Sequence, residues 1–210
     1  DCEALELSAL REPEVGPLLE SLDFLDVSAF RYVAVHAPSR FEVGREPALI
    51  RQLARRVPDH WPIVLHPDAA HDLRAWGVLG GRLLIENMDK RKPTGRSVGE
   101  LARVFDLLPQ AGFCFDIGHA RQFDPTMIEA ASILRAFPAR LRQVHVSDVT
   151  TGSRHDRLSG PAIAAFQTVA HLIPEQTPLI LETPVDEADL EIEMGRAREA
   201  VAVPTPALGD

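Results

Sequence analysis

Metal-binding side chains end a series of short apolar segments in this sequence. Each of six runs rich in Val, Ile, Leu and Phe leads into such a residue, and these residues are His36, His66, Glu86, Asp116, His145 and Glu182. Imidazole nitrogens and carboxylate oxygens are donors that Zn²⁺ and Mn²⁺ take in proteins, and iron is a further candidate. The absence of thiolates from the set argues against a closed structural zinc site. We therefore expect a centre with a position open to water or substrate.

Further polar residues lie in the segments just after these runs. His119 follows Asp116 by three positions, and the segment after His145 carries His155, Asp156 and Arg157. Gathering so many carboxylates and imidazoles in a partly buried pocket would be strongly unfavourable without cations or hydrogen bonds to compensate. The sequence therefore predicts a cofactor of one to three divalent metal ions.

The apolar runs themselves predict strands that are buried on both faces. They cover residues 4–8, 32–36, 63–66, 83–86, 113–116, 144–147 and 179–182. Segments with helical periodicity lie between them, and their start signals are Pro47, Pro125 behind a capping Asp124, and the capping box of Ser97 and Glu100. A last helix is expected from Asp186 toward Val201. This alternation is typical of a parallel sheet with crossover helices.

The spacing of the strand ends predicts the kind of sheet. The ends recur at intervals of roughly 30 residues, as expected of a TIM (β/α)8 barrel, in which active sites lie at the carboxyl ends of the strands. Seven visible strands predict an α/β barrel of this type without its first βα unit, so about 30 further residues are expected before Asp1. An open doubly wound sheet is the alternative, but no glycine-rich phosphate loop follows any strand. We predict one domain over residues 1–203 and a tail over 204–210.

Composition narrows the classes of protein. The chain has 210 residues, 45% of them hydrophobic, which is enough for one substantial core. A net charge of −9 argues against a broad nucleic-acid-binding surface. No apolar run approaches the roughly 20 residues that cross a bilayer, and no signal-peptide pattern begins the chain, so a cytoplasmic protein without membrane contact is expected. Two isolated cysteines exclude a disulfide framework. The oligomeric state stays open.

Several segments together resemble the xylose isomerase-like TIM-barrel superfamily, which includes AP endonuclease family 2. They are Val35-His36-Ala37-Pro38, Leu65-His66-Pro67, Ile85-Glu86-Asn87, Phe115-Asp116-Ile117-Gly118-His119, Val144-His145-Val146-Ser147-Asp148 and Leu181-Glu182-Thr183-Pro184. The superfamily holds sugar isomerases and epimerases as well as abasic-site nucleases of the endonuclease IV type. The resemblance implies that a tetrad shared by the family binds a metal, and its members here are Glu86, Asp116, His145 and Glu182.

The nuclease branch implies further ligands. By that resemblance His36 and His66 hold a second metal that Glu86 bridges, and His119 holds a third with help from the loop after His145. That loop, residues 153–158, is similar to the nuclease's S-R-x-D-R-H stretch, which places Asp156 on a ligand. Leu158 stands where a ligand histidine is expected and cannot bind metal. Whether His155 replaces it stays open.

Two reactions suit this set of residues. In the first, the enzyme is an isomerase or epimerase for a sugar or sugar phosphate, and the catalytic residues Glu86 and Glu182 transfer a proton at the reacting carbon. The expected substrate contacts are His119, His155, Arg157 and Lys90. In the second, a zinc-dependent phosphodiesterase or endonuclease uses two or three metals around Glu86.

Different features of the sequence support the hydrolase and the isomerase hypotheses. The extra pair His36 and His66 favours the hydrolase. The acidic balance and the lack of basic or bulky residues to grip a duplex favour a small sugar substrate over nucleic acid. On balance the sequence predicts the isomerase or epimerase. A non-catalytic sugar-phosphate-binding module is a further alternative.

Overall fold

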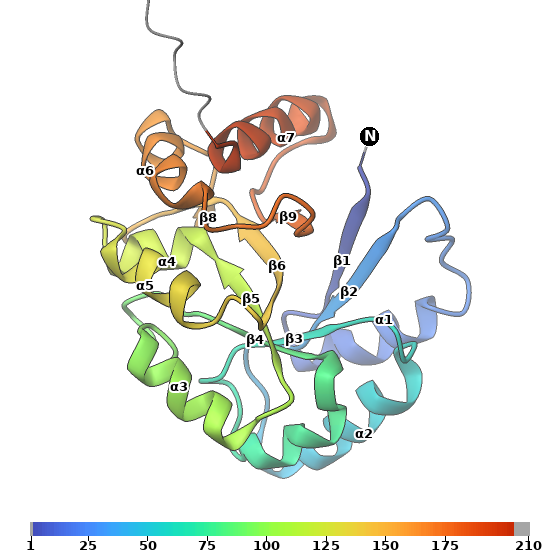
Figure 1. Ribbon diagram of the computed structural model, residues 1–210. Helices are drawn as coiled ribbons and strands as arrows, with labels where there is room; N and C mark the ends of the chain where they lie inside the picture. The colour runs from blue at the N-terminus through green and yellow to red at the C-terminus, as the bar shows by residue number, and fades with distance from the viewer. Residues whose placement is uncertain (1, 204–210) are drawn as a thin grey trace, which may run out of the picture.

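Seven parallel strands form one sheet that curls into a nearly closed barrel in the computed structural model, which describes residues 2–203 (Figure 1). The strands are β1 (Ala4–Ser8), β2 (Tyr32–His36), β3 (Ile63–Leu65), β4 (Leu83–Glu86), β5 (Gly112–Asp116), β6 (Leu141–Val146) and β9 (Leu179–Leu181). They hydrogen-bond in sequence order, so that β1 and β9 are the two edges. The predicted TIM-type α/β fold is confirmed, and seven strands agree with a barrel that is one unit short of eight.

Helices cover the outside of the barrel. The α-helices are α1 (Val15–Ser21), α2 (Glu46–Arg56), α3 (Val98–Leu107), α4 (Ile117–Phe123), α5 (Ile128–Ala136), α6 (Gly160–Ala170) and α7 (Glu187–Val201). Three 3-10 segments accompany them: η1 (Glu12–Glu14), η2 (Val43–Arg45) and η3 (Leu73–Arg82). The last two helices, α6 and α7, pack against each other (Figure 1). Within the described residues, none of these helices has the length and apolar character needed to span a membrane.

Strand periodicity sorts side chains between the barrel interior and the helices. Successive side chains of a strand point to opposite faces. Val64, Leu84 and Cys114 form a small apolar cluster of their own, separate from the main core to which their neighbours Leu65 and Ile85 belong. Residues two positions further along each strand share the face of this small cluster. The strand-end residues are therefore directed into the carboxyl end of the barrel.

Local signals place most elements where the sequence predicts them. Ser97 caps α3 by accepting the backbone N–H of Glu100, and Asp186 is the residue that precedes α7. The helix start predicted at Pro125 is wrong, because α5 starts only at Ile128. The Asp124 carboxylate accepts the N–H of Thr126 in the preceding turn and the N–H of Glu129 in the first turn of the helix. The predicted tail 204–210 lies outside the described residues.

A short antiparallel hairpin projects after β6. It consists of β7 (Asp148–Val149) and β8 (His155–Asp156). Asp148 anchors it, because its carboxylate pairs with Arg121 of α4 at 2.6 Å and accepts the Ser159 hydroxyl at 2.6 Å. The hairpin therefore holds His155 near the carboxyl ends of the strands.

Candidate metal centre

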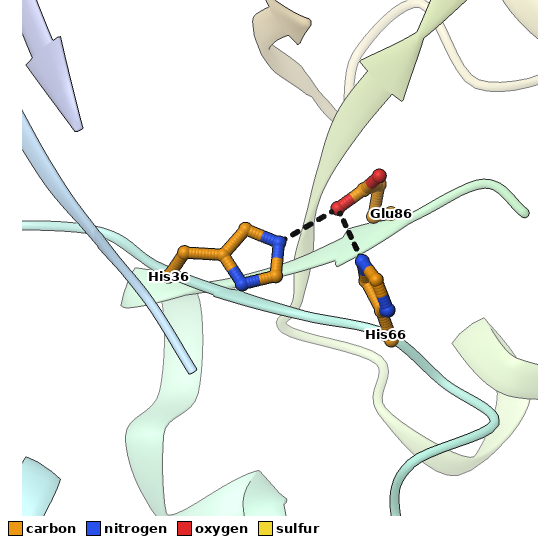
Figure 2. A group of neighbouring side chains, drawn as sticks. All are labelled: His36, His66 and Glu86. Atoms are coloured by element: carbon orange, nitrogen blue, oxygen red, sulfur yellow. Dashed lines mark hydrogen bonds and ion pairs between the residues drawn. The ribbon is translucent and has the colours of Figure 1, made fainter. Parts of the chain in front are cut away.

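Two histidines from neighbouring strands meet on one carboxylate oxygen. His36 ends β2, His66 directly follows β3 and Glu86 ends β4. The Nε2 atoms of His36 and His66 lie 3.0 and 3.2 Å from Glu86 Oε2 (Figure 2). His36 and Glu86 are almost completely buried, and the other ring nitrogen of His36, Nδ1, lies 2.7 Å from the carbonyl of Ala37. This contact orients the ring so that Nε2 faces the carboxylate.

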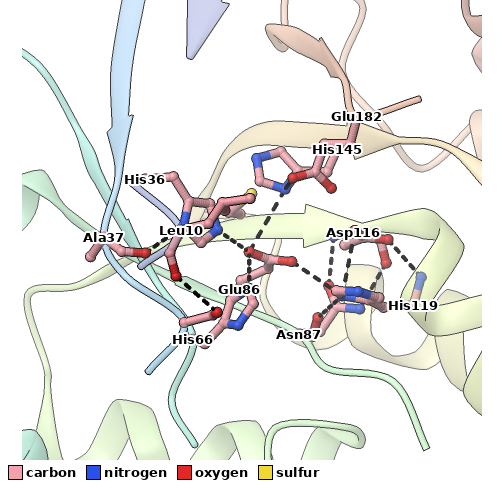
Figure 3. Close-up of polar contacts among 12 residues, drawn as sticks. Leu10, His36, Ala37, His66, Glu86, Asn87, Asp116, His119, His145 and Glu182 are labelled. Carbon is pink, nitrogen blue, oxygen red and sulfur yellow. Dashed lines mark hydrogen bonds and ion pairs between the residues drawn. The ribbon is translucent and has the colours of Figure 1, made fainter. Parts of the chain in front are cut away.

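A second group surrounds the same glutamate on its other side. Glu86, Asp116, His145 and Glu182 have ligand atoms that all lie within 4.8 Å of one another. His145 Nδ1 is 3.3 Å from Glu182 Oε1 and 3.7 Å from Glu86 Oε2. In Figure 3, Glu86 lies between His36 and His66 on one side and Asp116 and His145 on the other. The structure thus brings together the four residues that the resemblance implied as a tetrad.

A third group lies beside the tetrad. Asp116, His119 and His155 also place one ligand atom each within 4.8 Å of the others. His119 Nδ1 is 3.1 Å from Glu86 Oε1 and 3.4 Å from Asp116 Oδ2. His155 Nδ1 lies 2.7 Å from the Ser147 hydroxyl and 3.5 Å from Glu182 Oε2. His155 is therefore the residue of this loop that lies with Asp116 and His119.

Local hydrogen bonds set the position of Asp116. The Asn87 amide donates to the carbonyl of Asp116 and accepts its N–H, both at 2.8 Å, which joins the ends of β4 and β5. Asp116 also caps α4, because its Oδ1 accepts the His119 N–H at 2.6 Å. One carboxylate oxygen is thereby used for structure, and Oδ2 stays free to face the cluster.

The pKa values of His36 and His66, which both face Glu86 Oε2, are shifted in opposite directions. Burial opposes protonation of His36, but its hydrogen bond to Glu86 and the Glu6 charge outweigh this effect and raise its pKa to about 9. Burial lowers the pKa of His66, and the charges of His36 and Lys92 lower it further. His36 therefore carries the proton at neutral pH, and His66 is the more readily available donor for a metal.

The pKa values of the buried carboxylates are also shifted in opposite directions. Burial raises the pKa of Asp116 to about 7. Burial also acts on Glu86 and Glu182, but nearby imidazolium groups prevail and hold both pKa values below the usual range. Burial opposes protonation of His119, yet the Asp116 charge and the Glu86 hydrogen bond raise its pKa to about 10. In the metal-free protein, protons on the histidines therefore supply the positive charge that the buried carboxylates require.

The donor geometry fits divalent metals. Asp116 Oδ2, His145 Nδ1 and Glu182 Oε2 are buried and have no hydrogen-bond partner among the described residues. Two donors on one tetrahedral metal, each at about 2.1 Å, lie about 3.4 Å apart, and the measured separations of 3.0 to 3.7 Å surround this value. Buried polar atoms without partners are rare in folded proteins unless a ligand satisfies them. The three groups, which share Glu86 and Asp116, therefore suit divalent ions. Residues 2–203 contain two further groups of this kind: Glu86, Cys114 and His145, and Glu6, His36 and Glu182.

Some predicted site residues lie elsewhere. Asp156 is exposed, falls in none of the ligand groups found among residues 2–203, and accepts the N–H of Arg157. Arg157 is exposed and paired with Asp189 of α7, and the exposed Lys90 has only a backbone contact with Gln122. These positions give no support to Asp156 as a ligand or to Arg157 and Lys90 as substrate contacts.

The structure also adds residues to the site that the sequence predictions omitted. Glu6 of β1 places Oε2 3.2 Å from His145 Nε2, and its only sequence signal is a charge between two leucines of an apolar strand. Gln143 lies beside both residues. Lys92, rather than Lys90, lies near the first group: its charge acts on His66, and it pairs with Asp68 at 2.9 Å.

The family follows from a match to a family model. The chain belongs to the xylose isomerase-like TIM barrel family, whose model matches residues 31–203. This span contains all the predicted ligands and lacks only Glu6 among the residues just described. A comparison with curated proteins found no match.

Two solved structures have the same fold. Endonuclease IV from Thermus thermophilus is 17% identical, with a TM-score of 0.58, over 94% of this chain and 98% of that one. The apo form of the 3-keto-D-glucoside 4-epimerase YcjR from E. coli is 10% identical, with a TM-score of 0.51, over 96% of this chain and all of that one. At these identities the likeness concerns the fold, which serves enzymes of both kinds, so the reaction must be argued from the site.

Proposed function

We propose that the protein is a divalent-metal-dependent hydrolase of small phosphate esters, with Glu86 as the carboxylate that bridges two ions. The observation that carries the proposal is the use of both Glu86 oxygens. Two imidazoles face Oε2 at 3.0 and 3.2 Å, and a third faces Oε1 at 3.1 Å. A carboxylate enclosed in this way suits a bridging ligand, whereas a proton-transferring base needs an oxygen that faces substrate.

In this proposal, three sets of residues around Glu86 and Asp116 would hold the metal ions. His36 and His66 would hold one ion with Glu86. The tetrad would hold a second, and Asp116, His119 and His155 a third. When bound, such ions stabilise the charge that develops on a phosphoryl group and lower the pKa of water. The side chains of Glu182 and His155 are 19% and 31% exposed, so the side of the centre where they lie is the one that substrate can approach.

The surroundings favour a small substrate. Two cations near the carboxyl end of the barrel are paired with carboxylates, Lys92 with Asp68 and Arg121 with Asp148. A net charge of −9 also disfavours binding of a duplex. Lys92 is 27% exposed, and its charge acts on His66, so it is suited to contact one phosphate group at the centre.

The test is hydrolysis with defined metals. The purified protein, loaded in turn with Zn²⁺ and Mn²⁺, is assayed on bis(p-nitrophenyl) phosphate, p-nitrophenyl phosphate and an oligonucleotide with one abasic site. We expect turnover of a small ester at two or more bound ions per chain, and its loss in His66→Ala. The matched control is His60→Ala, an exposed histidine at the opposite end of the barrel. Full activity with one ion per chain would sink the proposal, and cleavage confined to the oligonucleotide would assign a nuclease instead.

A sugar or sugar-phosphate isomerase or epimerase is the second candidate. It is favoured by Glu86 and Glu182 lying in one group and by the unpartnered oxygen of Glu182. Its signature is exchange of a carbon-bound proton of a keto-sugar for solvent deuterium, followed by NMR. Exchange that survives in His66→Ala but is lost in Glu182→Gln would favour this reaction over hydrolysis. Binding of a sugar phosphate with neither exchange nor hydrolysis would indicate a non-catalytic module.

A further inference from the structure

The buried carboxylate of Glu6, on β1, contacts His145 of the candidate metal centre. The Glu6 side chain is 3% exposed, and its Oε2 lies 3.2 Å from His145 Nε2 and 2.7 Å from Gln143 Nε2. Gln143 in turn accepts the Tyr32 hydroxyl at 2.6 Å. This chain of contacts links β1 and β2 with β6, whose residues are more than 100 positions away in the sequence.

The two ring nitrogens of His145 have different surroundings. Nδ1 has no hydrogen-bond partner and faces Glu182 and Glu86, so it is the nitrogen that would bind metal. A neutral imidazole that binds metal through Nδ1 must carry its proton on Nε2. Gln143 points its amide nitrogen at Nε2, 2.7 Å away, and a nitrogen that donates cannot accept that proton. The Glu6 carboxylate is thus the acceptor within reach.

We propose that Glu6 is the positioning residue of the metal centre. It accepts the Nε2–H of His145, which fixes the tautomer and the direction of the ring and makes Nδ1 a stronger donor to the metal. Glu6 does not contact substrate; its hydrogen-bonded route to the metal is His145, and its charge also acts on His36. The inference rests on the proposed metal centre but not on the reaction carried out there.

The location of Glu6 supports this role over a purely structural one. The neighbouring layer of the barrel interior is apolar, with Val64, Leu84 and Cys114 in one small cluster. A carboxylate placed there loses hydration, and an apolar residue would fill the space at lower cost. Ionic contacts to His145 and the Gln143 hydrogen bond offset that loss. A buried charge aimed at the back of a ligand is the arrangement expected of a residue that tunes metal binding.

The experiment measures metal affinity without substrate. Co²⁺ is titrated into chelator-treated wild-type protein, Glu6→Gln, His145→Ala and the double variant, and its visible absorption is recorded. Tyr32→Phe is the matched control, because it removes a hydrogen bond to Gln143 but leaves the Glu6–His145 contact intact. Circular dichroism and thermal melts of the metal-free proteins report folding separately. Glu6→Asp replaces Glu6→Gln if the latter does not fold.

The expected result is a 10–100-fold weaker Co²⁺ affinity in Glu6→Gln, with the same number of ions at saturation and an altered spectrum. The substitution should add little in the His145→Ala background, because its hydrogen-bonded route to the metal passes through that ring. Unchanged affinity, an equal loss in both backgrounds, or the loss of one whole ion would overturn the inference. Wild-type protein that binds no Co²⁺ would overturn it together with the metal centre. Wild-type protein that binds Co²⁺ but hydrolyses no ester would overturn only the proposed function.

Discussion

At the scale of single residues, Glu86 organises the site through its two oxygens. Each oxygen is within 3.2 Å of at least one imidazole, and burial of the side chain keeps water from screening these charges. Because the candidate ligand groups share Glu86 but differ in their histidines, replacing one histidine at a time tests each group in turn.

We predict that His66→Ala lowers metal stoichiometry by one ion while the tetrad still binds. His66 contributes to the group with His36 but lies outside the tetrad. Elemental analysis of the purified variant beside wild type measures the difference. An unchanged metal content in the variant would show that His66 is not a ligand.

Leu158 gives a second prediction at this scale. A family comparison would suggest restoring histidine there, but Leu158 is 3% exposed and belongs to the hydrophobic core. Its N–H donates to the buried Glu193 of α7, which holds this segment away from the ligand groups. We expect Leu158→His to bind no additional ion and to lower the free energy of unfolding by about 2 kcal/mol, because a polar ring replaces a packed leucine. Urea denaturation and metal analysis test both parts, and a gained ion would refute the placement.

At the scale of elements, the start of α4 depends on a close approach to the end of β6. A Cβ atom on Gly118 would lie 2.5 Å from the Ser147 carbonyl oxygen and 2.7 Å from Val149. The helix therefore sits close enough for Asp116 and His119 to face the residues of β6. Glycine is required here for space rather than for its backbone angles.

We predict that Gly118→Ala destabilises the fold by about 2 kcal/mol, because backbone must move to admit the methyl group. It should also weaken metal binding by displacing His119. Gly195→Ala in α7 is the matched control, since nothing lies within 4 Å of its Cβ position, and it should stabilise the helix by about 0.5–1 kcal/mol. Denaturant unfolding of both variants measures the contrast. Equal effects in the two would contradict the packing argument.

At the scale of the whole molecule, ionisable groups are concentrated at one end of the barrel. The predicted ligands include three acids and four histidines with little exposure, which the metal-free fold tolerates only by holding protons. Metal would replace those protons as the source of positive charge. Folding, metal content and pH are therefore expected to be coupled.

We predict that the melting temperature of the metal-free protein falls between pH 6.5 and 9. The folded-state pKa values of His36 and His119, about 9 and 10, exceed the ordinary 6.5. Their stabilisation is complete below pH 6.5 and is lost as pH rises through the folded values. Asp116, raised to about 7 from 3.8, acts in the same direction at lower pH. The lowered pKa values of Glu86 and Glu182 remove stability only on the acid side, below about pH 4.5.

Thermal melts across this range, with chelator and with added Zn²⁺, provide the measurement. Metal at 100 times its Kd should add about 2.7 kcal/mol of stability. The loaded protein should also lack the alkaline decline, because bound ligands carry no proton to lose. A metal-free melting temperature that rises from pH 6.5 to 9 would contradict the assignment of protons to the histidines.

Much of the fold and of the candidate site could be predicted from the sequence, for reasons visible in particular residues. Apolar runs that end in His36, Glu86 and Asp116 identify buried strands, and their period of about 30 residues identifies a barrel. Turn chemistry was harder to predict. Asp124 and Pro125 carry the signals of a helix start, but a turn intervenes and α5 begins only at Ile128. The Asp124 carboxylate accepts one N–H of that turn and one of the first helical turn, and nothing local in the sequence indicates this spacing.

The kinds of donor at the strand ends can be read from the sequence, because side-chain type and a two-residue strand period are local properties. Which of their atoms meet depends on the tertiary structure. Barrel curvature brings His36 and His66 to the same oxygen of Glu86, directs His155 inward and leaves the adjacent Asp156 outside. It also places Glu6 behind His145, 139 positions along the chain. Such contacts depend on the register and closure of all seven strands, and no short stretch of sequence carries that information.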